Sequence, residues 1–314
     1  MSGRIVALTG ATGFIGRHLL RELPKRGYRM RVLVRRPTAL PPEATSAVIG
    51  DLAAPRNLSD ALRGVDAVIH SAGLAHAMSG HPEDDYRSIN TEATIALARA
   101  AERAGARRFV FLSSIRAQTG PSAAGVLTEA DAPRPTDAYG RSKLAAEEGL
   151  AGLGLDWVAL RPALVYGPGV KGNMAALVRL AARPLPLPVG ALRNQRSLVG
   201  LDNLAEAVDL VLGLPEALRR PLIVADPEPI TVAGMIAALR EGLGRGPGVF
   251  PLPPPVLALA ARLAGREDAY ARLAGSLVAS PAALTRLGWR PVSSTRDGLA
   301  ALARSVGEGS GASA

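Results

Sequence analysis

Tyr139 and Lys143 stand four residues apart in the segment Tyr-Gly-Arg-Ser-Lys. On a helix, residues with this spacing lie on one face, so the phenol and the ammonium group would address the same site. A free phenol has a pKa of about 10, which is too high for an efficient base at neutral pH, and a nearby ammonium group lowers it. The pair therefore predicts proton transfer at a hydroxyl or carbonyl group of a substrate.

Ser113 and Ser114 follow the apolar run at residues 108–112, where a buried strand is expected to end. A hydroxyl group at this place can hydrogen-bond the substrate oxygen and orient it toward Tyr139. Serines also occur at strand ends for structural reasons alone. Because the strand precedes the predicted Tyr139 helix along the chain, the catalytic interpretation of Ser114 is favoured.

A glycine-rich segment, Thr-Gly-Ala-Thr-Gly-Phe-Ile-Gly, occupies residues 9–16 between a predicted strand and a predicted helix. Gly10, Gly13 and Gly16 permit a tight turn, and free N–H groups at the helix start attract a pyrophosphate. The spacing is Gly-x-x-Gly-x-x-Gly rather than the commoner Gly-x-Gly-x-x-Gly. At the start of a βαβ unit it predicts a dinucleotide site, and an oxidised nicotinamide there would lower the pKa of Tyr139 further.

Short β-rich runs alternate with helical patterns through the first half of the chain. Such alternation gives βαβ units, and right-handed crossovers then cover a parallel sheet with helices on both faces. The sequence predicts an α/β fold with a doubly wound parallel sheet of the Rossmann type. We expect strands at 5–8, 31–34, 47–49, 67–70, 108–112 and 157–160, and helices over 83–104 and from about Asp137.

The alternation of strand and helix patterns ends after Tyr166, where glycine and proline become frequent. Residues 201–214 look helical and residues 222–225 strand-like, which indicates a return to the sheet. We expect a dinucleotide-binding domain from residues 1–166 and about 198–226, and a smaller C-terminal substrate-binding domain from about 167–197 and 227–304. The Gly/Ser/Ala-rich residues 305–314 predict a flexible tail.

The composition excludes several classes of protein. Of the 314 residues 48% are hydrophobic, which is enough for a large buried core. The absence of cysteine excludes disulfides and thiolate metal sites, predicts no metal, and fits a cytoplasmic location. The net charge of +10 comes from scattered arginines, so no nucleic-acid partner is expected. No apolar run reaches spanning length, so no membrane span is expected.

The glycine-rich segment, read as TGATGFIG, resembles the opening of the extended short-chain dehydrogenase/reductases, the NAD-dependent epimerase/dehydratase family. The resemblance runs from Arg4 to about Leu302. It implies an NAD(P) cofactor and a catalytic trio of Tyr139, Lys143 and Ser114. It also implies cofactor contacts from Gly10, Thr12, Gly13, Phe14, Ile15, Gly16, Asp51, Leu52, Ser71, Ala72, Gly73, Asn90, Ser113, Tyr139, Lys143 and Arg161.

The end of the second predicted strand bears on the choice between NAD and NADP. An acidic residue there normally meets the ribose of NAD, but this chain has Arg35 and Arg36. A guanidinium group pairs with a 2′-phosphate, so the two arginines favour NADP. Solvated arginines beside bound NAD are the alternative. His70, directly before Ser71, is interpreted as a packing residue rather than a catalyst.

Two later segments resemble the substrate side of the family: RPALVYGPG at 161–169 and RSLVGLDNLA at 196–205. The leading arginine of the second motif often binds the pyrophosphate of a nucleotide sugar, a role that suits a guanidinium group. The resemblance therefore implies a nucleotide-sugar substrate held by Arg196, Asn173 and Ser114. A surface role for Arg196 is the alternative.

The chain departs from the family pattern at two places that border the substrate. Val199-Gly200 replaces the usual Ile-His, and residues 115–120 replace a loop that ends in Val-Tyr-Gly. The identity of the sugar therefore stays open. Ile115 and Arg116 stand where 4,6-dehydratases carry an Asp-Glu pair, so the sequence disfavours dehydration.

Three functions remain open at this point. The resemblance implies action at C4 of a UDP- or dTDP-linked hexose, either by an epimerase that returns the hydride to the opposite face or by a reductase that consumes NADPH. The alternative from another class is a non-catalytic, dinucleotide-binding structural or regulatory subunit. The resemblance also implies a homodimer in which helices at 83–104 and 137–150 pair with those of a second copy.

Overall fold

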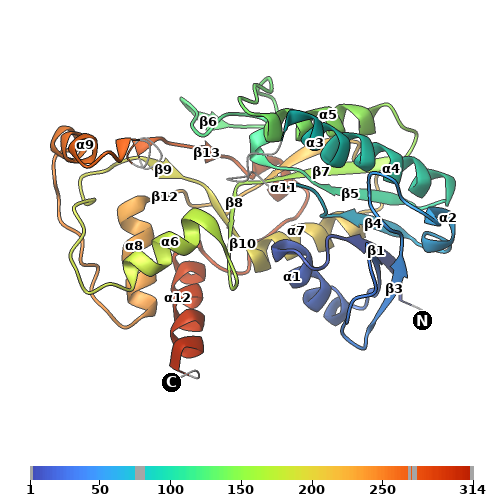
Figure 1. Ribbon diagram of the computed structural model, residues 1–314, viewed down its shortest axis with the longest axis horizontal. Coiled ribbons are helices and arrows are strands. Elements are labelled where there is room, and N and C mark those ends of the chain that lie inside the picture. The colour runs from blue at the N-terminus through green and yellow to red at the C-terminus, as the bar shows by residue number, and fades with distance from the viewer. Residues whose placement is uncertain (1–2, 75–81, 268–269, 271–273, 312–314) are drawn as a thin grey trace.

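The computed structural model describes residues 3–74, 82–267, 270 and 274–311. Its centre is a seven-stranded sheet of order β11-β7-β5-β4-β1-β2-β3, in which every neighbouring pair is parallel (Figure 1). The order of the strands reverses between β1 and β4, which confirms the predicted doubly wound sheet. The strands are β1 (Ile5–Thr9), β2 (Arg29–Val34), β3 (Ala44–Val48), β4 (Ala67–His70), β5 (Arg108–Leu112), β7 (Asp156–Pro162) and β11 (Arg220–Val224).

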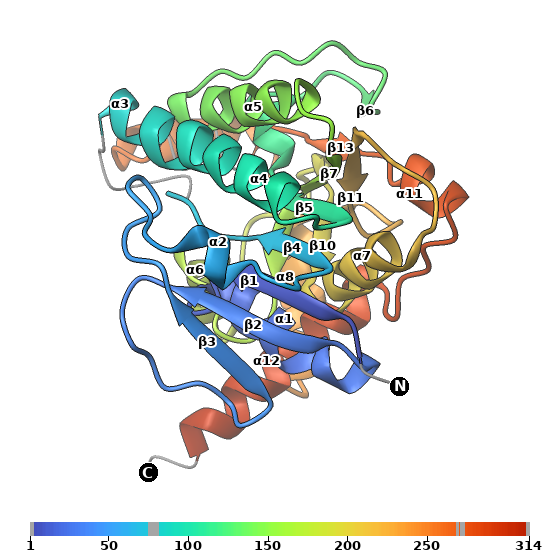
Figure 2. The ribbon, with the colours of Figure 1, turned by 90° about the vertical axis from the view of Figure 1, so that its right-hand side faces the viewer.

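Helices cover both faces of the sheet, so the central strands β1, β4, β5 and β7 are buried on both sides and consist mostly of apolar residues. In β1, Leu8 belongs to a core shared with α1 and α7, whereas Ala7 points into a second core shared with α4 and α5. Figure 2 shows α4 and α5 together on one side of the sheet. The bounds are α1 (Phe14–Glu22), η1 (Pro24–Arg26), α2 (Leu58–Ala61), α4 (Ala93–Arg103), α5 (Ala138–Ala151) and α7 (Leu201–Gly213).

The helix expected over residues 83–104 is interrupted by a π-helical segment. α3 (Glu83–Tyr86) leads into η2 (Arg87–Glu92), which has π-helical geometry, and then into α4. A π turn changes the direction in which the following side chains point and is frequent at functional sites. Here it carries Asn90, which is fully buried and hydrogen-bonds to Leu74 just beyond β4.

A third core lies outside the sheet, among α6, α8 and α12, where Met174, Met235 and Leu299 are buried. The pairs β8–β10 and β9–β12 adjoin this core, whereas the pair β6–β13 contributes Leu127 and Ala279 to a small separate core with Ile115 and Ala163. Among the described residues no helix is long and apolar enough to cross a membrane. The remaining elements are η3 (Ile115–Ala117), β6 (Val126–Leu127), β8 (Leu164–Tyr166), α6 (Gly172–Ala181), β9 (Gln195–Arg196), β10 (Leu198–Gly200), β12 (Ile230–Thr231), α8 (Val232–Gly242), α9 (Pro254–Leu263), β13 (Val278–Ala279), α11 (Ala282–Arg286) and α12 (Thr295–Gly311).

Two stretches differ from the expected domain ranges. Leu284 and Trp289, expected in the smaller domain, pack in the core of α1 and α7 because α11 lies beside β11. Residues 305–311, expected in a flexible tail, continue α12 as a helix through Gly311.

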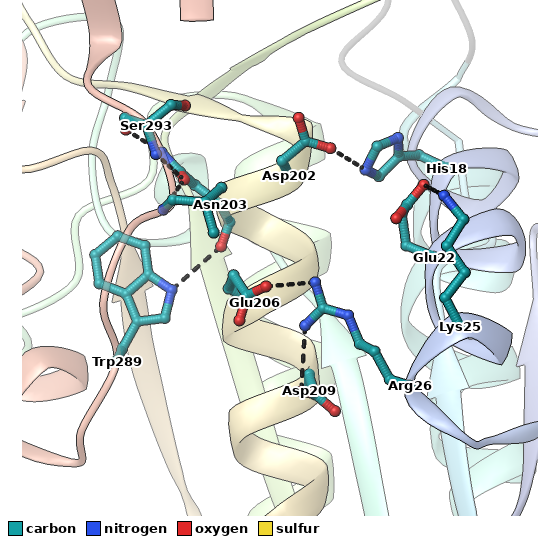
Figure 3. A network of polar contacts seen from close by, with 11 residues as sticks. His18, Glu22, Lys25, Arg26, Asp202, Asn203, Glu206, Asp209, Trp289 and Ser293 are labelled. Carbon is teal, nitrogen blue, oxygen red and sulfur yellow. Dashed lines mark hydrogen bonds and ion pairs between the residues drawn. The ribbon is translucent and has the colours of Figure 1, made fainter.

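Polar contacts on both sides fix α7, the helix that follows β10 (Figure 3). On one side Arg26, in η1, forms ion pairs with Glu206 and Asp209. On the other side the indole N–H of Trp289 donates to the Asn203 carbonyl oxygen over 3.2 Å. Arg26 and Trp289 are far apart in the sequence, so α7 connects an early segment of the chain with a late one.

Asp226, directly after β11, connects the sheet with the smaller domain. Its carboxylate accepts hydrogen bonds from Asn203 Nδ2 at 2.7 Å, from the Tyr166 hydroxyl at 3.1 Å and from Thr295 Oγ1 at 3.3 Å. Burial raises the pKa of Asp226, and the hydrogen bonds from these donors oppose that effect. The buried carboxylate thus holds α7, β8 and the start of α12 in one arrangement.

Candidate active site

The glycine-rich loop passes very close to the end of β4. A Cβ atom at Gly10 would lie 2.6 Å from the Ala72 nitrogen, and one at Gly16 would lie 2.1 Å from the Gly10 carbonyl oxygen. Gly10 also has a φ of +70°, which glycine adopts without strain. In the described structure α1 has no side-chain cap and no acidic residue in its first turn, so its amides are available to an anion.

The other predicted cofactor residues gather at the same edge of the sheet, because parallel strands end together there. Arg35 and Arg36 are exposed directly after β2, and Asp51 and Leu52 lie just beyond β3. Ser71, Ala72 and Gly73 follow β4, and Ser113 follows β5. The sheet therefore brings these segments, together with Thr12, Phe14 and Ile15 of the glycine-rich loop, to one end of the molecule.

His70 at the end of β4 is a structural residue. Its Nδ1 lies 2.7 Å from Thr9 Oγ1 and its Nε2 lies 2.9 Å from Thr94 Oγ1, with the ring fully buried. Burial, with a smaller effect of the Lys143 charge, lowers the pKa of His70 to about 3. The imidazole is therefore neutral at physiological pH and links β1, β4 and α4, as expected for a packing residue.

Asn90 holds the loop after β4 in place. Its Oδ1 accepts from the Leu74 amide at 2.8 Å, and its Nδ2 donates to the Leu74 carbonyl and to Ser142 Oγ, each at 3.1 Å. A Cβ atom at Gly73 would lie 2.7 Å from Asn90 Oδ1 and 3.5 Å from Lys143 Nζ. Glycine at position 73 therefore lets the loop run directly beside the Lys143 ammonium group.

The predicted trio comes together where β5 ends against α5. Asp137 caps α5, accepting from the Gly140 amide at 2.7 Å. A side chain at Gly140 would put Cβ 2.3 Å from the Arg116 carbonyl oxygen, so only glycine lets α5 approach η3 this closely. At this contact Ser114 hydrogen-bonds to the Tyr139 phenol.

The electrostatics of the pair differ from the prediction made from the spacing alone. Lys143 Nζ donates to the Leu112 carbonyl at 3.0 Å and lies 6.0 Å from the centre of the Tyr139 ring. Burial raises the pKa of Tyr139 to about 12, although the hydrogen bond from Ser114 opposes the shift. Burial also lowers the pKa of Lys143 to about 8, against the charge of Glu147. In the protein alone, desolvation outweighs the hydrogen bond from Ser114, and the phenol keeps its proton.

A buried polar network beneath Lys143 was not foreseen. Glu147 accepts from Ser113 Oγ and pairs with Arg161, whose Nε lies 3.1 Å from each carboxylate oxygen. Arg161 also donates to Gln118 Oε1 at 2.7 Å. The signal for Glu147 was its position one helical turn after Lys143 on the same face.

Arg161 was predicted to contact the cofactor, and the structure places it differently. Its side chain is only 3% exposed, and its guanidinium group is directed to Glu147 and Gln118. A buried guanidinium group requires a paired carboxylate, which explains this position. Arg161 therefore supports the end of α5 from within the core.

Two of the three predicted substrate residues, Arg196 and Asn173, lie in the smaller domain, and the third, Ser114, follows β5 of the sheet. Arg196 is half-buried in β9, between β12 and an isolated bridge to Leu277, and burial lowers the pKa of its guanidinium group. Asn173 is exposed in the first turn of α6. Arg116, beside Ser114, forms an ion pair with Asp137 at the start of α5. The structure thus brings Arg116, rather than Asn173, close to the trio.

Comparison with known proteins identifies relatives over most of the chain. The model of the NAD dependent epimerase/dehydratase family matches residues 6–225. The chain is 34% identical over 304 residues to a UDP-glucose 4-epimerase of Vibrio cholerae, covering 93% of this chain and 92% of that protein. It is 32% identical over 278 residues to a ceramide reductase of Caulobacter vibrioides, covering 79% and 82%. The structure of MoeE5 in complex with UDP-glucose and NAD superimposes with a TM-score of 0.74 at 29% identity, covering 98% and 99%.

The buried Glu147–Arg161 pair yields a prediction for stability. Replacing Glu147 with Gln leaves the Arg161 charge buried without its carboxylate, so we expect a loss of about 3–5 kcal/mol in the free energy of unfolding. The double variant E147L/R161M, which removes both charges, should lose less than E147Q. Urea unfolding followed by circular dichroism measures both.

An exposed pair provides the control. Glu83 lies 2.8 Å from Arg141, but its side chain is 62% exposed, so E83Q should change stability by no more than about 0.5 kcal/mol. The prediction is wrong if E83Q and E147Q lose the same stability, or if the double variant is less stable than E147Q. Either result would show that the unpaired Arg161 charge is not the main cause of the loss.

Proposed function

The chain belongs to the NAD-dependent epimerase/dehydratase family, and from this premise we propose that it is an epimerase acting at C4 of a UDP- or dTDP-linked hexose. The observation that carries the proposal is the Ser114–Tyr139 hydrogen bond, with Lys143 buried beside it at the edge of the sheet where the glycine-rich loop lies. The nearly full-length similarity to a UDP-glucose 4-epimerase supports the choice of substrate class and reaction.

The residues at this edge fit a nicotinamide dinucleotide. The uncapped first turn of α1 and the close passage of Gly10 suit a pyrophosphate, which needs amide donors and backbone approach. Lys143, beside which the loop at Gly73 runs, would hold the nicotinamide ribose. When bound, the cofactor supplies the acceptor or donor of a hydride.

Ser114 and Tyr139 supply the proton chemistry in this proposal. Ser114 Oγ would hydrogen-bond the substrate oxygen at C4 and hold it against the phenol. Tyr139 would give a proton to that oxygen when the carbon is reduced and take it back when the carbon is oxidised. Lys143 would favour the phenolate during oxidation through its positive charge, which the Leu112 carbonyl holds in place.

The surroundings of Ser114 support a reaction without water elimination. Elimination needs an acid and a base beside the sugar, where this chain has Ile115 and Arg116. Ile115 is buried and Arg116 is paired with Asp137. We therefore propose that the product keeps all its hydroxyl groups. We also propose that Arg196, from β9, binds the diphosphate of the substrate. The predicted homodimer and the sugar itself remain predictions.

A reductase is the second candidate. Arg35 and Arg36 are exposed after β2, where two guanidinium groups suit the 2′-phosphate of NADPH, the usual cofactor of biosynthetic reduction. Similarity to a ceramide reductase points in the same direction. Two incubations separate the two candidates. An epimerase interconverts UDP-glucose and UDP-galactose without net change in cofactor absorbance, whereas a reductase leaves both sugars unchanged and consumes NADPH only when a UDP-4-keto-hexose is supplied as the hydride acceptor.

Replacing Tyr139 with Phe should reduce kcat by about 10²–10⁴-fold, because the proton then lacks its donor and acceptor. The cofactor should still bind, since the glycine-rich loop is untouched. The matched control is Y86F, which removes the hydroxyl of the neighbouring ring, 6.4 Å away between ring centres. Sugar interconversion and cofactor binding measure the two effects. A wild-type protein that interconverts no sugar, together with a Y139F variant whose biological activity is unchanged, would favour the non-catalytic, dinucleotide-binding subunit.

The buried ammonium group predicts an alkaline limb in the pH profile. Lys143 has a pKa of about 8, so its charged form is lost as the pH rises above that value. We expect kcat/KM, which reports the free enzyme, to fall about tenfold per pH unit there. K143R keeps its charge at these pH values and should lack this limb, whatever its absolute rate. A K143R profile with the same limb would assign the titration to another group.

Arg35 and Arg36 predict that the protein prefers NADP to NAD. If they hold a 2′-phosphate, R35A/R36A should weaken NADP binding at least about tenfold, because charge-assisted hydrogen bonds to phosphate are lost. NAD lacks that phosphate and serves as the internal control. Isothermal titration with both cofactors measures the change. Equal affinities of the wild-type protein for NAD and NADP would show that the arginines are only solvated.

A further inference from the structure

The outer end of the smaller domain carries a cavity of about 300 Å³, remote from the predicted site and lined by Arg183, Arg240 and Arg245. Arg240 is buried and donates to the carbonyls of Leu185 and Gly248, each at 2.6 Å. It thereby holds residues 183–187 and 245–250 side by side. Arg183 and Arg245 stay exposed at the mouth of the cavity.

Residues 183–187, residues 245–250 and α9 lie along the same outer edge of the molecule, at the left of Figure 1, and carry large apolar side chains that are exposed. Leu185 is 63% exposed and Phe250 is 41% exposed, one on each of the two paired segments. On α9, Val256, Leu259 and Leu263 are 50%, 57% and 82% exposed. Their i, i+3, i+7 spacing places all three on one face of the helix, so α9 presents an apolar stripe to solvent.

The charge around this edge is mostly positive. The sequence has no Asp or Glu from residue 157 to residue 201, or from residue 242 to residue 266. These segments contribute Arg183 and Arg245 near the cavity, and Arg262 and Arg266 near the end of α9. Glu267, which lies 3.4 Å from Arg262, and Asp268 follow this stretch and balance part of the positive charge there. The excess of positive charge therefore lies at the cavity end of the apolar edge.

We propose that this edge, formed by the arginine-lined cavity, Leu185, Phe250 and the apolar face of α9, docks on a membrane surface that contains anionic phospholipid. An anionic lipid surface supplies both features that the edge matches, phosphate groups for the arginines and an apolar layer for the exposed side chains. A short helix with one apolar face and flanking basic residues lies in such an interface rather than across it.

Vesicle co-sedimentation of the full chain tests the proposal. The protein should sediment with vesicles of equal parts phosphatidylcholine and phosphatidylglycerol, less with phosphatidylcholine alone, and less at high salt. L259E/L263E puts charge on the apolar face and R183A/R245A removes two cations, and each should weaken binding roughly tenfold or more. V48E/V292E changes two equally exposed valines elsewhere and should bind like the wild type.

Binding of NADP and the thermal midpoint show whether each variant folds. If L259E/L263E does not fold, R183A/R245A alone tests the proposal. Absence of sedimentation of the wild-type protein, or sedimentation that neither variant reduces, would overturn the proposal. So would a change in the oligomeric mass of L259E/L263E without lipid, because the apolar face would then be an interface between protein chains.

Discussion

The arrangement of the site depends on one constraint, the burial of the Lys143 ammonium group. A buried cation is tolerated only with acceptors or a compensating charge close by. Lys143 has the Leu112 carbonyl at 3.0 Å and the face of the Phe111 ring at 4.5 Å, both from β5. These contacts fix α5 against the end of β5, and this position in turn brings Tyr139 to Ser114.

The same constraint extends into the core through Glu147. Its carboxylate favours the charged form of Lys143, but a buried carboxylate needs partners of its own. Arg161 on β7 and Ser113 at the end of β5 provide them, and Gln118 then occupies the remaining side of Arg161. The helix α5, which carries Tyr139 and Lys143, is therefore held by a polar network that lies within the core.

Local patterns predicted the sheet, the glycine-rich loop and the trio, because each depends on spacing within one element or at one strand end. The Glu147–Arg161 pair joins residues 14 positions apart that meet only after α5 packs on β7. The pairing of β9 with β12 is likewise decided by tertiary contacts of very short strands. The sign of the Tyr139 pKa shift was missed for a related reason, since the desolvation that raises this pKa depends on how the whole fold packs around the ring.

That shift has a consequence for the chemistry. With a pKa of about 12 for Tyr139 and about 8 for Lys143, the protein alone presents a protonated phenol beside a charged ammonium group at neutral pH. Such a site can donate a proton to a carbonyl oxygen, but it is a poor base. The positive charge of an oxidised nicotinamide would favour the phenolate, and a reduced, neutral ring would not. The direction of proton transfer would then follow the redox state of the cofactor, so one tyrosine could serve both half-reactions of an epimerase.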